Sequence, residues 1–195
     1  MSARAWLDDA TALMLGAVDG VDDATFASPS TLPNWTVGHI VAHLHFNAEA
    51  IGRLAAWAGT GIETPMYPSM AHRNSDIEAG ASLPPAELRR LVHASAAALA
   101  DAFDGLTPEM WANTVVTAQG RTVPALELVW MRFREVATHG IDLGTGITFG
   151  DLPSEAVARL VDEIVAKRLA GGEGPALAAW LTGRRDAGPP LGPWL

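Results

Sequence analysis

The sequence predicts an all-α protein. Four or five segments carry apolar residues at helical spacing, and loops dense in Pro, Gly and Asp separate them. No segment alternates apolar and polar residues for long enough to support a sheet. The chain has 195 residues, of which 49% are hydrophobic and 18% charged. This composition excludes a natively disordered chain and suits one domain with a small appendage.

The first two helices have clear boundary signals. The first is predicted from Ala3 to Val18, before a loop rich in Asp and Gly. The second is long. It begins after Asn34 or Thr36, either of which is a suitable N-cap, and it ends near Ala58 before a Gly-Thr-Gly segment.

Residues 60–82 contain several Pro and Gly residues and little periodicity, which predicts an extended loop with at most a short helical turn at residues 75–79. Such long loops often border a site. The third helix is expected to open with a capping box near Ser82 and to run to about Phe103, where Gly105 ends it.

The fourth helix is predicted to open at Pro124 and to end near Gly144. A fifth helix follows over residues 154–170, and the Gly/Pro-rich tail holds one short helical piece at residues 175–181. We therefore expect residues 1–150 to form the main helical domain and residues 151–195 to form an abbreviated C-terminal helix and tail.

Composition also excludes several function classes. A formal net charge of −9 without a basic cluster argues against nucleic-acid and membrane-surface binding. No apolar run reaches the roughly 20 residues of a membrane span, and acidic residues near the N-terminus argue against a secretion signal, so we expect a cytoplasmic protein. Because the chain has no cysteine, any metal must be bound by His and carboxylates.

A helical wheel of the second helix shows two adjoining groups. The core stripe consists of Val37, Ile40, Leu44 and Ile51. His43 and Asn47 lie one turn apart at its edge. A histidine in this position is most simply a hydrogen-bonded residue at the edge of the core. The remaining histidines are expected on the surface or in loops: His39, His45, His72 and His93.

The fourth helix carries one polar stripe beside a wide apolar face. Its members are Arg132, Glu135, His139 and Asp142. Glu135 and His139 stand at i and i+4, so their side chains can converge on one point, as in a metal site. This spacing alone is weak evidence for a metal site, because a salt bridge of Arg132 with Glu135 or Asp142, with His139 hydrogen-bonded to it, explains the same stripe.

Three segments of the chain resemble the mycothiol-dependent maleylpyruvate isomerase family, which belongs to the DinB-like group of metal-binding four-helix bundles. These segments are Leu32-Pro-Asn-Trp-Thr-Val-Gly-His-Ile-Val-Ala-His-Leu-His-Phe-Asn-Ala48, Trp130-Met-Arg-Phe-Arg-Glu-Val-Ala-Thr-His-Gly-Ile-Asp-Leu143 and Leu177-Ala-Ala-Trp-Leu-Thr-Gly-Arg184. The first two are specific because they occur in the family's order and on the matching helices. The resemblance implies a DinB-like four-helix bundle.

The resemblance further implies that His43, Glu135 and His139 bind one zinc ion. Three protein ligands leave a coordination position open, as in catalytic zinc sites. The thiol is implied to be mycothiol, since the chain has none of its own. In the family's reaction the thiolate adds to the cis double bond of maleylpyruvate, the adduct rotates about the new single bond, and elimination gives fumarylpyruvate.

Three further residues or pairs are weaker candidates for binding the substrate or positioning a ligand. Asn47 and Arg132 share the zone of the expected ligands and are candidates to hold a substrate carboxylate or to position a ligand. Full-length family members carry a separate C-terminal domain whose arginine is thought to bind the substrate. Arg184 or Arg185 would take that role if the tail folds back. The expected partners are a small-molecule substrate and a low-molecular-weight thiol, with the protein a monomer or small homo-oligomer.

Two alternatives stay open. A mycothiol S-transferase would use the same site but would consume thiol in proportion to product, whereas an isomerase returns it. A non-enzymatic binding module would use the metal only to join two helices. Such a module would need a fourth protein ligand, for which His39, one turn from His43, is the obvious candidate.

Overall fold

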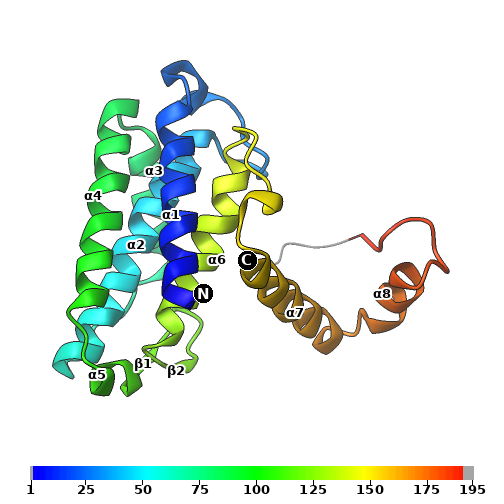
Figure 1. Cartoon of the computed structure of the whole chain (residues 1–195). Helices are drawn as coiled ribbons and strands as arrows, with labels where there is room; N and C mark the ends of the chain where they lie inside the picture. Colours follow the sequence, from blue (N-terminus) through cyan, green and yellow to red (C-terminus); the bar gives the residue numbers. More distant parts are fainter. Residues whose placement is uncertain (1, 191–195) are drawn as a thin grey trace. The chain divides into compact units, whose positions relative to one another are not determined.

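The four main helices run side by side as a bundle in the computed structural model, which describes residues 2–190 (Figure 1). They are α1 (Ala3–Gly20), α2 (Val37–Thr60), α4 (Pro85–Asp104) and α6 (Glu127–Asp142). Helix α2 packs most extensively on α4, and α1 on α6. The all-α prediction is therefore confirmed.

The chain divides between Leu152 and Pro153 into two compact units. The first contains the bundle together with η1 (Asp23–Ala27), α3 (Met70–Ala81), α5 (Pro108–Ala112) and η2 (Phe149–Asp151). The second contains α7 (Ser154–Ala170) and α8 (Gly174–Leu181). Arg168 near the end of α7 is paired with Glu173, Nη1 to Oε2, at 3.0 Å, which ties these two helices together.

Helix α2 begins and ends where its sequence dictates. The Thr36 hydroxyl accepts the His39 backbone N–H, and the His39 ring accepts the Thr36 backbone N–H, so a reciprocal capping box fixes the first turn. Gly61 ends the helix in a left-handed conformation with φ 73°, which a residue without Cβ adopts at little cost. The capping box at Thr36 fixes where the helix begins, and His43 then lies one helical turn after His39.

Helix α3 lies where the sequence predicted an extended loop, so that prediction was wrong. Ser69 caps it by accepting the His72 backbone N–H. Along its 12 residues only Ile77 and Gly80 are buried. A helix with so narrow a buried face leaves almost no apolar periodicity in the sequence, and its stability comes from packing on α2.

Two helix starts also differ from the predictions. Pro84 precedes α4 without a side-chain cap, and Ser82 instead ends α3, so no capping box forms there. Pro124 does not open α6, because it belongs to strand β2 (Thr122–Pro124), which pairs antiparallel with β1 (Thr114–Val116). Strands of three residues are too short to show alternation in the sequence.

The α2–α3 contact depends on a glycine. A Cβ at Gly80 would lie 2.9 Å from the Cβ of Ala42 and 2.9 Å from Cε2 of Phe46, closer than carbon atoms pack. We expect Gly80→Ala to lower the free energy of unfolding by about 1–3 kcal/mol through overpacking, as measured by urea denaturation. Gly52→Ala on α2 is the matched control, since a Cβ there meets no atom within 4 Å. Equal stability of the two variants would contradict this account of the contact.

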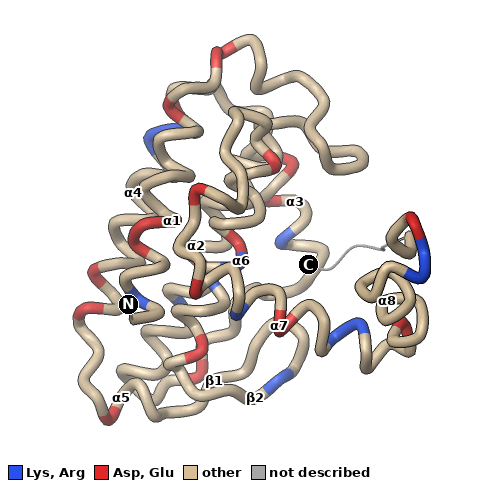
Figure 2. Tube along the Cα trace, turned by 45° about the vertical axis from the view of Figure 1, so that its right-hand side comes forward, with Lys and Arg blue, Asp and Glu red and all other residues tan. Residues whose placement is uncertain are grey.

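Acidic residues, which outnumber basic ones 22 to 13, are spread over helices and loops, as Figure 2 shows. Within residues 2–190, none of the helices combines the length and apolar character needed to cross a membrane.

Candidate metal centre

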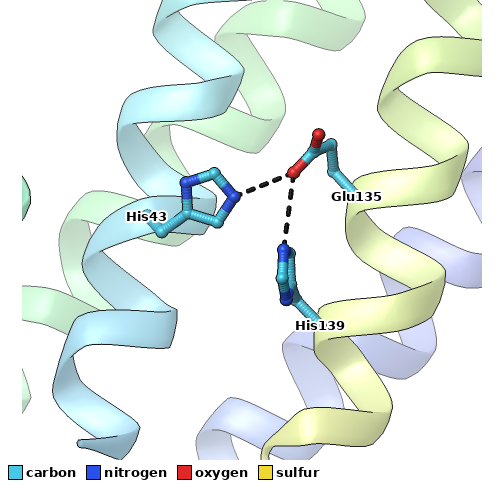
Figure 3. Close-up of side chains that lie close together, drawn as sticks. All are labelled: His43, Glu135 and His139. Atoms are coloured by element: carbon cyan, nitrogen blue, oxygen red, sulfur yellow. Dashed lines mark hydrogen bonds and ion pairs between the residues drawn. The ribbon is translucent and has the colours of Figure 1, made fainter. Parts of the chain in front are cut away.

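Three side chains of α2 and α6 converge inside the bundle, and Figure 3 shows them pointing toward one another. Nε2 of His43 lies 2.8 Å from Oε2 of Glu135. Nε2 of His139 lies 3.6 Å from the same oxygen. The His43 and His139 rings meet edge to face, with centroids 4.8 Å apart. The two segments singled out in the sequence thus meet at one point.

The spacing of these groups suits a single metal ion. One ligand atom from each of the three residues lies within 4.8 Å of the other two. Donor atoms placed about 2.0–2.2 Å from a tetrahedral zinc ion lie about 3.3–3.6 Å from one another. The 2.8 Å and 3.6 Å separations bracket that range. Small side-chain adjustments are therefore sufficient to place an ion among the donors.

Burial and neighbouring charges shift the pKa values at the centre. Burial alone would raise the pKa of Glu135, but its hydrogen bond with His43 and its electrostatic interactions with His43, His139 and Arg132 lower that pKa to about 2. Burial lowers the pKa of His43, against the opposing effect of Glu135. An ionised carboxylate beside a neutral imidazole is the protonation state in which both groups bind a metal.

Each histidine has a partner for its other ring nitrogen. Nδ1 of His139 lies 2.9 Å from Oδ2 of Asp142, one turn along α6. Nδ1 of His43 accepts a hydrogen bond of 3.2 Å from Nη2 of Arg73 on α3. The contact with Asp142 is of the kind that fixes ring orientation and tautomer at metal sites. The contact with Arg73 instead requires an unprotonated Nδ1 on His43.

Aromatic and cationic side chains surround the centre. The Trp35 ring lies 5.4 Å from the His43 ring and 6.4 Å from the His139 ring, centroid to centroid. The guanidinium of Arg73 lies 5.9 Å from the Tyr67 ring centroid. Sequence reasoning missed Arg73 and Tyr67 because both lie in the segment predicted as a loop; their only signal was that such a segment often borders a site.

Asn47 and Arg132 are hydrogen-bonded to each other in the core. Nη1 of Arg132 donates to Oδ1 of Asn47 at 2.7 Å and to the Leu44 carbonyl at 2.9 Å. Arg132 is 1% exposed and Asn47 is 4% exposed. Neither Glu135 nor Asp142 forms a salt bridge with Arg132 within the described part of the chain, so the alternative explanation of the polar stripe by such a pair is wrong. The guanidinium reaches α2 and joins it to α6.

The other histidines lie outside the centre. His39 is bonded at both ring nitrogens, to Thr36 at 2.7 Å through Nδ1 and to Glu78 at 3.2 Å through Nε2. His72 and His93 are exposed, as predicted.

His45 was predicted to lie at the surface, and that prediction was wrong. It is 6% exposed, and its ring lies 4.6 Å from that of Phe46. Helix α2 packs against α3, α4 and α6, so residues outside the narrow apolar arc of the wheel are also covered. Arg184 and Arg185, the remaining candidates, follow α8 in the second unit and are exposed.

Comparison with known proteins shows the family to which the chain belongs. Residues 7–144 match the family model of the mycothiol maleylpyruvate isomerase N-terminal domain. The crystal structure of a mycothiol-dependent maleylpyruvate isomerase is 42% identical, with a TM-score of 0.80, covering 84% of this chain and 70% of that one. A histidine-to-alanine mutant of that enzyme matches with the same values. A search of curated proteins found no match. The chain belongs to the mycothiol maleylpyruvate isomerase family, with the family's N-terminal domain lying in the helical bundle.

Proposed function

We propose that this protein is a metal- and thiol-dependent cis–trans isomerase that acts on maleylpyruvate or a similar unsaturated keto acid. The observation that carries the proposal is the convergence of His43, Glu135 and His139 from two helices onto one point. In the proposal these three residues hold a divalent metal, zinc, and the thiol is mycothiol. Membership of the family supports the proposed substrate class and the proposed thiol.

A zinc ion bound here would lower the pKa of a coordinated thiol and so maintain it as the thiolate. The chain contains no cysteine, so the nucleophile must come from a separate molecule. A thiolate is the form that adds to an activated double bond, which is the chemistry that the proposed isomerisation needs.

The number of available donors favours catalysis over a purely structural metal. Within residues 2–190, the group of converging donors contains three residues and no fourth. His39, the candidate fourth ligand, is held by Thr36 and Glu78 through its two nitrogens. A three-ligand set leaves a position for an exogenous thiol, as catalytic zinc sites do for water or substrate.

Arg73 is the residue that we propose to bind a substrate carboxylate. It donates to Nδ1 of His43, so in this tautomer the His43 proton lies on Nε2, facing Glu135. When Nε2 of His43 is used as a metal ligand, its proton must move to Nδ1, which then no longer accepts from Arg73. The guanidinium, held beside the Tyr67 ring, is then available to a carboxylate at the centre.

For Asn47 and Arg132 we propose a positioning role. Their hydrogen bond, together with the bond from Arg132 to the Leu44 carbonyl, fixes α2 against α6 beside the three donors. They therefore set the distance between His43 and Glu135 without touching the substrate. For Arg184 we retain substrate-carboxylate binding as a proposal, to be tested by its own alanine variant.

Thiol stoichiometry tests the proposed reaction. We expect the zinc-loaded protein to convert maleylpyruvate completely with far less mycothiol than substrate, because isomerisation regenerates the thiol. Substrate and product are followed by absorbance and free thiol by titration. The control is the same protein stripped of metal by a chelator and then reloaded. Thiol loss equal to product would identify an S-transferase, and no turnover by the zinc-loaded protein would favour a binding module. Either outcome would overturn the proposal.

A further inference from the structure

A cavity of about 230 Å³ lies between α1 and α4, apart from the candidate metal centre. Most of its lining is apolar and includes Leu7, Leu15, Leu99 and Phe103. The one lining residue contributed by α6 is Arg132. The residues of the metal centre, His43, Glu135 and His139, do not line it. The cavity is therefore a space separate from the metal centre, lined by residues of α1 and α4 and by Arg132 of α6.

Arg132 is incompletely satisfied. One of its terminal nitrogens, Nη1, serves both Asn47 and the Leu44 carbonyl, whereas Nη2 is buried and finds no hydrogen-bond partner among residues 2–190. Its direct partners are neutral, and no carboxylate of the described residues lies within 4.0 Å of it. Glu135 acts on this buried charge only from beyond ion-pair distance. A carboxylate in direct contact with the guanidinium would therefore offset more of the cost of burying it.

We propose that this cavity binds a small apolar monocarboxylate whose carboxylate is held by Arg132. The hydrocarbon part lies between α1 and α4, against Leu7, Leu99 and Phe103. The volume is about eight times the ~30 Å³ that a water molecule occupies in the liquid, which suits a ligand of about eight to ten non-hydrogen atoms. This inference does not depend on the proposed isomerase function.

The charges around the cavity fix the direction of the ligand. Arg4 and Asp8 also line it, and they are paired with each other, Nε to Oδ1, at 2.9 Å. Arg4 also bonds Asp104, Nη1 to Oδ1, at 2.8 Å. Arg4 is thus shared between the carboxylates of Asp8 and Asp104, which would repel a third carboxylate. The carboxylate of the ligand is therefore disfavoured beside Arg4 and favoured at Arg132. The hydrocarbon therefore extends from Arg132 toward the α1–α4 surface.

Calorimetric titration of the metal-loaded protein with octanoate tests this proposal, with octanamide as the neutral isostere. We expect one octanoate per chain and about tenfold weaker binding of octanamide, since a charge-assisted hydrogen bond exceeds a neutral one by roughly that factor. The main variant is Ala100→Phe, which fills the cavity and is expected to abolish octanoate binding. Ala98→Phe, on an exposed position of the same helix that does not line the cavity, is the matched control and is expected to bind normally.

Two results would overturn the proposal. The first is no octanoate binding by the unmodified protein at millimolar concentration, which would mean that water alone fills the cavity. The second is octanoate binding that survives Ala100→Phe, which would locate the ligand elsewhere, including at the metal centre. The Arg132→Met variant gives a further test, once circular dichroism has shown that the variant folds. It should bind octanoate and octanamide with equal affinity.

Discussion

His139→Ala and His43→Ala are each expected to eliminate stoichiometric zinc binding and to lower kcat/KM by about 10³-fold or more. Each variant leaves two of the three proposed ligands, and losing the metal removes several kcal/mol of transition-state stabilisation. Elemental analysis measures the metal, and an isomerisation assay with mycothiol measures the rate. Circular dichroism should show nearly unchanged helical content, because the bundle contacts of α2 and α6 lie mainly at other residues.

His93→Ala is the matched control for these two variants. His93 lies on the exposed side of α4, where its Nε2 is 2.9 Å from Oδ1 of Asp19, and it is not part of the metal centre. The control should retain one zinc per chain and full activity. One zinc per chain in both His43→Ala and His139→Ala would refute the ligand assignment.

Arg73→Ala is expected to lower kcat/KM by about 10- to 100-fold while zinc content stays at one per chain. The proposed role of Arg73 is one charge-assisted contact to a substrate carboxylate, and such contacts contribute about 1.5–3 kcal/mol. Arg73→Lys should recover part of the loss, because it keeps the charge but not the planar fork of donors. Steady-state kinetics with maleylpyruvate at saturating thiol measures the effect.

Arg90→Ala controls for the change in net charge, since Arg90 is exposed on α4 and, among residues 2–190, forms its ion pair with Glu87 alone. Its kcat/KM should match that of the unmodified protein. An equal loss in Arg90→Ala and Arg73→Ala would mean that the effect is long-range attraction of an anionic substrate. Loss of zinc in Arg73→Ala would instead assign Arg73 to the positioning of His43.

The parts of the fold that were predictable are the helices with clear boundary residues in the sequence, a cap residue or a proline before the helix and a glycine after it. Helix α7 has the predicted bounds, and α2 begins directly after Thr36, one of the two predicted caps. Helix α3 and the β1–β2 ribbon were not predictable. The first buries too few residues to produce a pattern, and the second has strands too short to show one.

The candidate site also has a part that could be predicted from the sequence and a part that could not. The i, i+4 spacing of Glu135 and His139 is visible within one helix, whereas the addition of His43 required the resemblance to a family. Arg73 could not be predicted, because only the packing of α3 on α2 brings it to His43. The bond between Arg132 and Asn47 likewise joins residues 85 positions apart, and neither side chain carries a local sign of its partner.

The 92 positions between His43 and Glu135 have a thermodynamic consequence. In the unfolded chain the donors of α2 and α6 are far apart, so a metal that binds all three binds almost only the folded state. Each tenfold excess of free metal over its Kd then adds about 1.4 kcal/mol to the free energy of unfolding. The ion would thus act as a concentration-dependent clamp between two helices, and the stability of the protein would follow the metal supply of its surroundings.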